Sequence, residues 1–315
     1  MSAIKLSYVI TTYNKLPYLK EVMRLLLLHK KEDEEIVIAD GGSTDGTVDF
    51  LDGLFREEKI DQFISEKDKG EAHGYNKTFL MAKGDLIKVI TDDDVFYYPA
   101  IDACRKFMEE NNTIDILVGN NGTATFSILE SPFLNPEMQL EFEKYAANLN
   151  KTFYCNGLPL MIRRNSLPLV GLFNTQFLCV DIEYTIRTGL IANYAFATQF
   201  IATRIINPNS NSDRFSERCK LEQSRLCREY DYPIPPTWGG SEILVVKRSL
   251  WWRFKNYINT WLKSFNQPTQ QVKQALKIKA KVQELKIGDL YNYHYTVLEE
   301  LNQNIKQDYL TKQIN

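Results

Sequence analysis

The chain has 315 residues, of which 44% are hydrophobic and 25% are charged, and its formal net charge at pH 7 is −2. This is the composition of a globular protein, which excludes a wholly disordered chain, and the lack of net positive charge argues against a dedicated nucleic-acid-binding protein. Five cysteines without a Cys-x-x-Cys pair, and no secretory apolar segment after Met1, predict a reduced, cytoplasmic protein.

The first 120 residues alternate between the sequence signals of strands and of helices. Runs of β-branched and apolar residues predict strands, and apolar residues spaced by three or four predict the helices between them. The predicted strands are residues 6–10, 35–39, 62–65, 86–90 and 114–118, and the predicted helices follow Asn14 and span residues 47–56, 71–83 and 99–110. This alternation predicts a doubly wound, mostly parallel α/β sheet, which binds ligands at the carboxyl ends of its strands.

The rest of the chain differs in pattern and in charge. Residues 121–240 are irregular, whereas the chain from residue 241 onward has a helical pattern. Residues 247–286 hold ten Lys or Arg and one acidic residue, in a chain whose total charge is −2. We therefore predict a domain of residues 1–240, with halves of about 1–120 and 121–240, and a basic, aromatic helical extension of residues 241–315.

Three consecutive aspartates, Asp92, Asp93 and Asp94, follow the predicted strand 86–90. Adjacent carboxylates repel one another unless a cation offsets their charge, and hard oxygen ligands suit Mg²⁺ or Mn²⁺. Because side chains alternate along an extended chain, Asp92 and Asp94 can converge on one ion. A solvated acidic turn, or a cluster that caps a helix, explains the same residues without a ligand.

Asp40 ends a second predicted strand and precedes a glycine-rich turn, Gly-Gly-Ser-Thr-Asp-Gly. Glycines allow the backbone to approach a ligand closely, and a carboxylate at this point can accept a hydrogen bond from the N–H group of a base. Ser43 or Asp45 of the same turn can also cap the helix that follows, and the two roles are compatible.

Six segments of the first 120 residues follow one another in a characteristic order. They are residues 10–14, 39–47, 68–70, 76–77, 82–85 and 92–94. In this order and spacing they resemble the family-2 glycosyltransferases of the GT-A fold, whose sheet has a Rossmann-like nucleotide-binding half. The resemblance covers residues 4–120 most closely and extends to about residue 212.

The resemblance implies a nucleotide-diphosphate sugar donor, with a UDP-sugar favoured, a Mn²⁺ or Mg²⁺ ion and an inverting single displacement. By position, Thr12 and Asp40 are expected to contact the base, Asp92 the ribose or the metal, and Asp94 the metal. Lys77 could assist the phosphates, although a solvated position on its helix is the slightly favoured explanation.

The base that accepts the proton of the acceptor hydroxyl is assigned by the same resemblance. Residues 179–187 match the segment in which relatives carry an acidic pair followed by an arginine, and Asp181 falls on the base position. Glu183 is the alternative, and Asp181 could instead cap a helix of residues 182–190. Many relatives place a metal-binding His after this segment, where the present chain has Asn207.

The acceptor side is expected to include Asn156, Gly157 and Trp238, although a plain turn before a core strand also explains residues 156–157. The acceptor is expected to be a sugar or a lipid-linked sugar, in surface-polysaccharide or glycolipid assembly. Residues 247–263 repeat aromatic and basic residues at helical spacing. They can form a peripheral contact with an anionic membrane, or pack on the first domain; nucleic acid is not expected as a partner.

Two other readings remain open from the sequence. One is a non-catalytic nucleotide-sugar-binding protein or membrane adaptor, which would bind nucleotide without turnover. The other is an aspartate-dependent phosphohydrolase, which would need its aspartate pair after the first strand, whereas here the aspartates follow the fourth.

Overall fold

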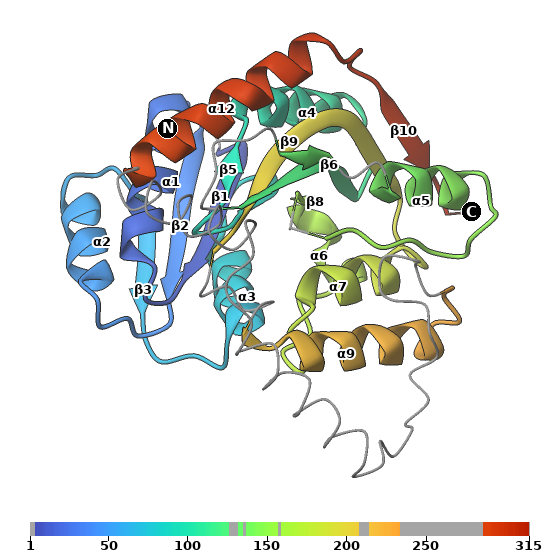
Figure 1. Cartoon of the computed structure of the whole chain (residues 1–315), viewed down its shortest axis with the longest axis horizontal. Coiled ribbons are helices and arrows are strands. Elements are labelled where there is room, and N and C mark those ends of the chain that lie inside the picture. Colours follow the sequence, from blue (N-terminus) through green and yellow to red (C-terminus); the bar gives the residue numbers. More distant parts are fainter. Residues whose placement is uncertain are drawn as a thin grey trace, which may run out of the picture. The chain divides into compact units, whose positions relative to one another are not determined.

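A mixed β-sheet runs through this computed structural model, which describes residues 4–125, 132–134, 137–156, 159–207, 214–233 and 286–314. The described strands are β1 (Leu6–Thr12), β2 (Glu34–Asp40), β3 (Gln62–Ser65), β4 (Leu86–Ile90), β5 (Val95–Phe96), β6 (Ile116–Thr125), β7 (Phe133–Leu134), β8 (Met161–Arg163), β9 (Tyr194–Ile206) and β10 (Tyr309–Lys312). The main path of the sheet is β10-β9-β6-β8-β4-β1-β2-β3, with β5 paired to β9 and β7 paired to β6 (Figure 1).

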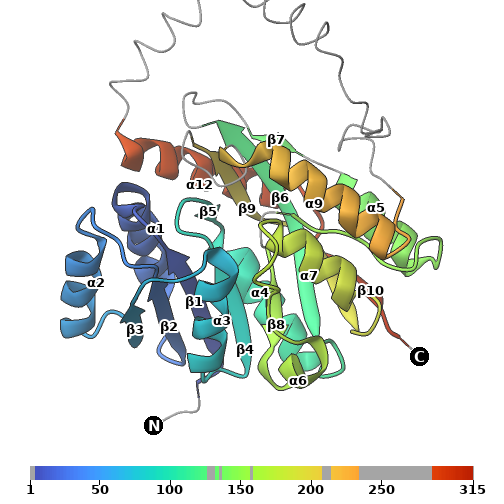
Figure 2. The same ribbon diagram turned by 90° about the horizontal axis from the view of Figure 1, so that it is seen from below.

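Strands β1 to β4 form a parallel half of the sheet, which confirms the predicted α/β class. Every residue of β1, β2 and β4 is buried, because helices cover both faces of the sheet. A strand that is buried on both faces has apolar residues at successive positions, rather than alternating apolar and polar residues. Such apolar runs are the pattern by which the sequence predicted these strands. The register places Thr12 directly beside Asp40, so the carboxyl ends of β1 and β2 meet at one edge (Figure 2).

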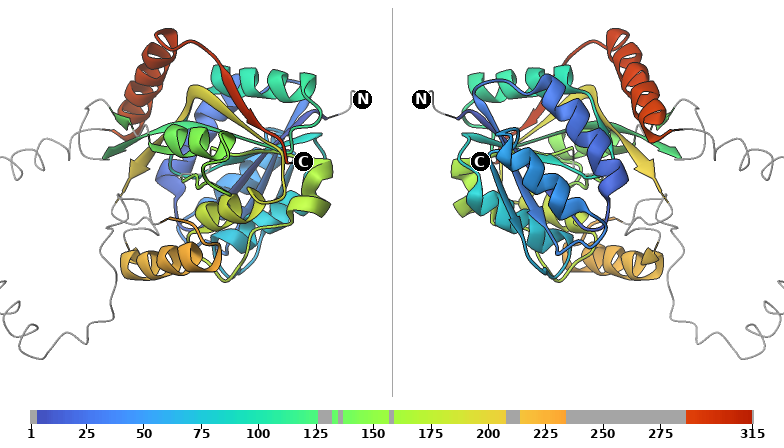
Figure 3. Two further views of the ribbon diagram at one scale, coloured as in Figure 1. Left: turned by 90° about the vertical axis from the view of Figure 1, so that its right-hand side faces the viewer. Right: turned by 90° about the vertical axis from the view of Figure 1, so that its left-hand side faces the viewer.

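Helices cover the two faces of the sheet in separate groups (Figure 3). One hydrophobic core lies under α1 (Leu16–His29), α2 (Thr47–Arg56), α4 (Tyr98–Glu110) and α12 (Ile287–Gln303). The other core lies under α3 (Glu71–Met81), α5 (Glu137–Ala146), α6 (Leu167–Val170) and α7 (Val180–Thr188). Helix α9 (Ser216–Glu229) lies beside α7 (Figure 2).

Helix α3 packs directly on β1 because Gly74 has no side chain. A Cβ atom at Gly74 would lie 1.9 Å from Oγ1 of Thr11, well inside contact distance. This close approach brings the start of α3, with Glu71, to the edge of the sheet where Thr12 ends β1.

The second half of the sheet is built around a strand of opposite direction. Strand β8 is antiparallel to both β4 and β6, whereas β9 runs parallel to β6 with register shifts between Gly119 and Asn121. The far end of β9 pairs with β5, where Thr203 lies opposite Val95. This pairing brings the end of β9 beside the three aspartates that precede β5.

The C-terminal residues complete the sheet. The predicted helical region is present as α12, but the expectation that residues up to 312 are helical is wrong, because residues 309–312 form β10 and pair with Ala195 and its neighbours in β9. Residues 286–314 belong to the same unit as residues 4–232, rather than to a separate extension. The strand was missed because four edge residues carry too short a pattern to distinguish a strand from a helix end.

The segment 247–263, with its predicted membrane or packing role, lies outside the described residues, and those roles stay predictions. Of the helices in the described ranges, none combines the length and the apolar character that crossing a bilayer requires.

His294 provides a test of how α12 is packed. Its side chain is fully buried, and neither ring nitrogen has a hydrogen-bond partner among the described residues. Burial lowers the pKa of His294 to about 4, so the folded protein resists a proton that the unfolded chain accepts near pH 6.5.

We therefore expect the unfolding free energy to fall as the pH drops from about 6.5 to about 4. A His294→Leu variant should lack the part of this fall that His294 causes. Between pH 7 and pH 4.5 the wild-type protein should lose about 2 to 3 kcal/mol more unfolding free energy than the variant, measured by urea unfolding. Parallel stability curves for the two proteins would contradict the assignment.

Candidate functional site

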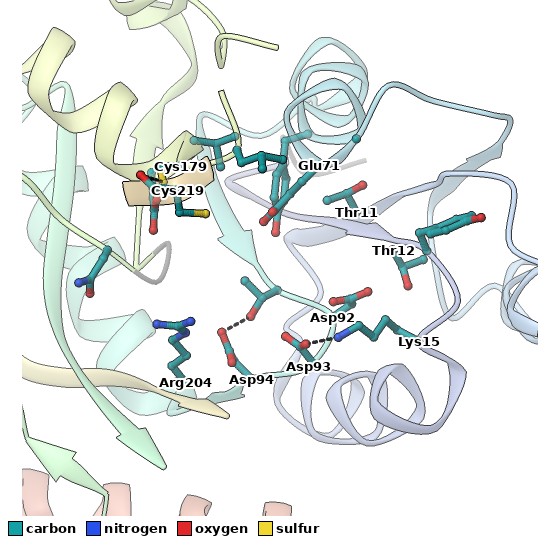
Figure 4. A pocket seen from close by; sticks show the side chains of 18 of the residues that line it. Thr11, Thr12, Lys15, Glu71, Asp92, Asp93, Asp94, Cys179, Arg204 and Cys219 are labelled. Atoms are coloured by element: carbon teal, nitrogen blue, oxygen red, sulfur yellow. Dashed lines mark hydrogen bonds and ion pairs between the residues drawn. The ribbon is translucent and has the colours of Figure 1, made fainter. Parts of the chain in front are cut away.

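A pocket of about 360 Å³ opens at the carboxyl ends of β1 and β4. On one side it is lined by Thr12 and by the three aspartates that follow β4 (Figure 4). It is also lined by Asp181, near the start of α7, and by Arg204 of β9, which lies beside Asp94 (Figure 4). The structure therefore brings Thr12, Asp92, Asp94 and Asp181 to one pocket, although they are far apart in the sequence.

The middle aspartate, Asp93, is anchored by other parts of the chain. Its Oδ2 atom accepts hydrogen bonds from Nζ of Lys15 at 2.6 Å and from Nδ2 of Asn207 at 2.6 Å. Its backbone carbonyl accepts a third hydrogen bond, of 2.7 Å, from the hydroxyl group of Tyr291 on α12. Burial, with the charge of Asp93 as the next cause, raises the pKa of Tyr291 well above its usual value, so this hydroxyl stays a donor.

Asp94 is held in a fixed orientation toward the pocket. Its Oδ2 atom accepts a hydrogen bond from the Thr91 hydroxyl at 2.6 Å, and its Oδ1 atom accepts one from the backbone N–H of Ile205 at 2.8 Å. Burial, together with the negative charge of Asp93, raises the pKa of Asp94 to about 7. Arg204 acts in the opposite direction and favours the ionised carboxylate.

Asp92 lines the same pocket, and burial followed by repulsion from Asp93 raises its pKa well above the ordinary value. Two carboxylates crowded in this way are costly to ionise, and a divalent cation between them would offset that cost. No group of three or more His, Cys, Asp or Glu side chains is placed to hold a metal ion in the described part of the chain. Two carboxylates are hard oxygen ligands of the kind that Mg²⁺ or Mn²⁺ accepts when phosphate and water supply the rest of its coordination.

At the ends of β1 and β2, the buried atoms Oγ1 of Thr12 and Oδ1 of Asp40 have no hydrogen-bond partner by distance among the described residues. The Thr12 hydroxyl is still near enough to Asp92 to lower the pKa of that carboxyl, against the larger effect of burial. The other carboxylate oxygen of Asp40 accepts hydrogen bonds from the backbone N–H groups of Gly42 and Ser43, at 2.9 Å each, and from the Ser65 hydroxyl at 2.7 Å. Thr12 lines the pocket, whereas Asp40 is fully buried next to it.

The N-cap position of α2 is Gly46, so neither Ser43 nor Asp45 occupies it, although Asp45 bonds the first residue of the helix. Asp45 accepts hydrogen bonds from the backbone N–H and the hydroxyl of Thr47, at the start of α2. Ser43 does not cap this helix; its hydroxyl accepts a hydrogen bond from the backbone N–H of Asn14 at 2.8 Å.

Asp181 is the second residue of α7 and lines the pocket, so it lies within the helix rather than at its cap. The alternative base, Glu183, is 1% exposed and forms an ion pair of 2.7 Å with Arg187. The first N–H groups near the start of α7 are satisfied from α9, because Oε2 of Glu222 accepts hydrogen bonds from Leu178 at 2.7 Å and from Cys179 at 3.1 Å.

The remaining predicted residues fall in different places. Lys77 does not line the pocket, and its Nζ atom forms an ion pair of 3.1 Å with Glu66. Asn156 lines the pocket, where its backbone carbonyl accepts a hydrogen bond from Asn121 at 2.7 Å. Gly157 and Trp238 lie outside the described residues, and their roles stay predictions.

Lys15, Glu222, Arg204 and Tyr291 were not predicted as site residues. Lys15 and Arg204 each stand next to a matched segment but carry no pattern of their own. Glu222 and Tyr291 lie on helices whose sequence shows only ordinary amphipathic spacing, so no local signal links them to the pocket.

Comparison with known proteins identifies related sequences and folds. The family model described as Glycosyl transferase family 2 matches residues 7–168. An uncharacterized glycosyltransferase of Rickettsia conorii is 34% identical over 110 residues, which make up 35% of this chain and 18% of that protein. The present chain therefore matches only a small part of that relative.

Two solved structures have a similar fold at low sequence identity. TarS 1–349 of S. aureus in complex with UDP-GlcNAc has a TM-score of 0.58 at 15% identity, over 95% of this chain and 92% of that one. The mannosyltransferase PcManGT of Pyrobaculum calidifontis in complex with GDP-Man and Mn²⁺ has a TM-score of 0.52 at 14% identity, over 94% and 85% of the two chains. These similarities confirm the predicted GT-A fold.

The ion pair between Lys15 and Asp93 can be tested by stability measurements without a metal. A Lys15→Met variant leaves a partly buried carboxylate unpaired beside Asp92 and Asp94, and should lose about 2 to 4 kcal/mol of unfolding free energy. Urea unfolding in the presence of EDTA measures this loss.

Two further variants serve as controls. Adding Asp93→Asn to Lys15→Met should recover part of the lost stability, because the unpaired charge is removed. Lys5→Met breaks the exposed ion pair with Asp85 and should leave the unfolding midpoint nearly unchanged. Equal losses in the two single variants would contradict the anchoring role of Lys15.

Proposed function

Because the chain belongs to glycosyl transferase family 2 and is a glycosyltransferase, we propose that it transfers a sugar from a nucleotide-diphosphate sugar to a hydroxyl acceptor with inversion. The observation that carries this proposal is the pocket itself, because Asp92 and Asp94, which follow β4, and Asp181 of α7 all line it. A sugar bound between these walls would have its leaving group on one side and its acceptor on the other.

The nucleoside part of the donor is proposed to lie at the carboxyl ends of β1 and β2. The unpartnered oxygen atoms of Thr12 and Asp40 would accept hydrogen bonds from N–H or O–H groups of the base and ribose. Tyr13 lines the pocket beside Thr12 and is 57% exposed, so its ring offers a surface for stacking. A UDP-sugar is the favoured donor, and TarS, whose structure holds UDP-GlcNAc, has a similar fold.

The diphosphate is proposed to lie over Asp92 and Asp94, which would hold a Mn²⁺ or Mg²⁺ ion. When bound, such an ion would neutralise the charge that grows on the leaving diphosphate. Arg204 lies beside Asp94 and points into the same space, so it would add positive charge there (Figure 4). Lys77 is better placed to hold Glu66 than to contact the phosphates.

Asp181 is proposed as the general base. It would take the proton of the acceptor hydroxyl as the acceptor oxygen bonds to the anomeric carbon and the bond to the diphosphate breaks. It lies in the first turn of α7, next to the partial positive charge of the helix N-terminus. Asn156 lines the pocket on the same side and is proposed to contact the sugar or the acceptor.

The acceptor is proposed to be a sugar or lipid-linked sugar of surface-polysaccharide or glycolipid assembly, and the enzyme to act at the cytoplasmic face of a membrane. The non-catalytic reading is less well supported, because the pocket holds a candidate base in addition to the nucleotide residues. The phosphohydrolase reading fails on position, because Asp92 and Asp94 follow β4 rather than β1.

The donor can be identified by thermal shift with a panel of nucleotide sugars in the presence of Mn²⁺. A donor present at 100 times its dissociation constant stabilises the folded protein by about 2.7 kcal/mol, which raises the melting temperature measurably. We expect one nucleotide class to stand out, and an Asp94→Asn variant to lose the Mn²⁺-dependent part of the shift. A panel without any shift would contradict the proposal.

The base can be tested with two matched carboxylate variants. Asp181→Asn should retain donor binding and lose transfer by a factor of about 10² to 10⁴, because the acceptor proton has no base to receive it. Glu183→Gln alters the neighbouring carboxylate, which does not line the pocket, and should retain transfer if it folds. Release of nucleoside diphosphate in the presence of acceptor is the measurement, and unchanged release from Asp181→Asn would move the base elsewhere.

A further inference from the structure

Helix α12 contacts the acidic segment formed by residues 91–94 and is bonded to several neighbouring elements. Near its middle, the Tyr295 hydroxyl lies 2.9 Å from Nε2 of His29, and the His29 ring stacks between Tyr295 and Tyr98. At its end, the Asn302 side chain makes two hydrogen bonds of 2.9 Å, to the backbone N–H and C=O of Phe200. These contacts fix α12 to α1, to α4 and to β9.

The acidic segment connects β4 to β5 and does not belong to a strand, so strand pairing does not hold its backbone. Its side chains are held by Thr91, Lys15, Asn207 and the backbone of Ile205. The Tyr291 hydroxyl donates to the backbone carbonyl of Asp93 at 2.7 Å, and the Tyr291 side chain is fully buried. Among the described contacts of α12, this one reaches the acidic segment.

The Asp93 carbonyl belongs to the peptide unit that joins Asp93 to Asp94. Fixing its oxygen fixes the plane of that peptide, and therefore the direction in which the Asp94 side chain leaves the backbone. If the carbonyl were free to rotate, only the hydrogen bonds of the Asp94 carboxylate to Thr91 and Ile205 would hold its orientation toward the pocket.

We infer that Tyr291 is a positioning residue of the active site, which holds the Asp93–Asp94 peptide so that Asp92 and Asp94 face the bound metal–nucleotide complex. The C-terminal helix is then part of the machinery that shapes the donor site, although it contributes no side chain to the pocket. This inference rests on the proposed function, because it assigns the purpose of the contact to binding of the metal and the nucleotide.

A Tyr291→Phe variant of the full chain removes the hydroxyl and keeps the packed ring. The matched control is Tyr145→Phe, because Tyr145 is 1% exposed and its hydroxyl donates to the backbone carbonyl of Gly189, at the far end of α7, at 2.6 Å. Both variants lose one buried hydrogen bond of the same type, so they should lose similar thermal stability.

Two measurements separate positioning from plain stability. Mn²⁺ is titrated into each protein with saturating UDP, and in a parallel series with saturating GDP, and the free ion is followed by electron paramagnetic resonance. We expect Tyr291→Phe to weaken Mn²⁺ binding about tenfold, and Tyr145→Phe to leave it unchanged. Hydrogen–deuterium exchange without metal should become faster in residues 91–96 of Tyr291→Phe only.

The outcomes distinguish this inference from the proposed function. If the wild-type protein bound no Mn²⁺ with either nucleotide, the proposed function would fail, and with it the purpose assigned to Tyr291. If the wild-type protein bound Mn²⁺ with at least one of the two nucleotides and Tyr291→Phe bound Mn²⁺ equally well, only the inference would be overturned. Unchanged exchange in residues 91–96, or the same loss in Tyr145→Phe, would also overturn it.

Discussion

Repulsion among three consecutive carboxylates is the constraint around which the pocket is organised. The chain resolves it by treating the three differently, since Asp93 is neutralised by Lys15 and bonded by Asn207, whereas Asp92 and Asp94 remain turned to the pocket with raised pKa values. The unfavourable electrostatics are thus confined to two side chains, where a bound cation can relieve them. Perturbed carboxylates in a cleft are characteristic of functional sites.

The anchors of Asp93 come from three distant parts of the chain. Lys15 precedes α1, Asn207 follows β9, and Tyr291 belongs to α12, so the acidic segment forms correctly only when the whole sheet and its C-terminal helix are assembled. The start of α7, which carries Asp181, is likewise bonded by a distant residue, because Glu222 of α9 accepts hydrogen bonds from the backbone N–H groups of Leu178 and Cys179.

Strands that are buried on both faces were predicted well, because their apolar runs differ from every other segment of the chain. The prediction was less accurate for short strands that form only because they pair with another strand of the sheet. Strand β10 exists because it pairs with β9, and β8 is inserted antiparallel between β4 and β6 by tertiary packing alone. Such short strands have no pattern long enough to reveal them.

The sequence by itself determined the fold class and the family, and it singled out Thr12, Asp92, Asp94 and Asp181, which are four of the residues that line the pocket. These residues stand in ordered motifs or at strand ends, where a local pattern can be recognised. Only the tertiary structure decided that Glu183 pairs with Arg187, that Lys77 pairs with Glu66, and that Tyr291 supports Asp93. A hydrogen bond between residues 198 positions apart depends on how helices and sheet pack, and no local pattern in the chain encodes that distance.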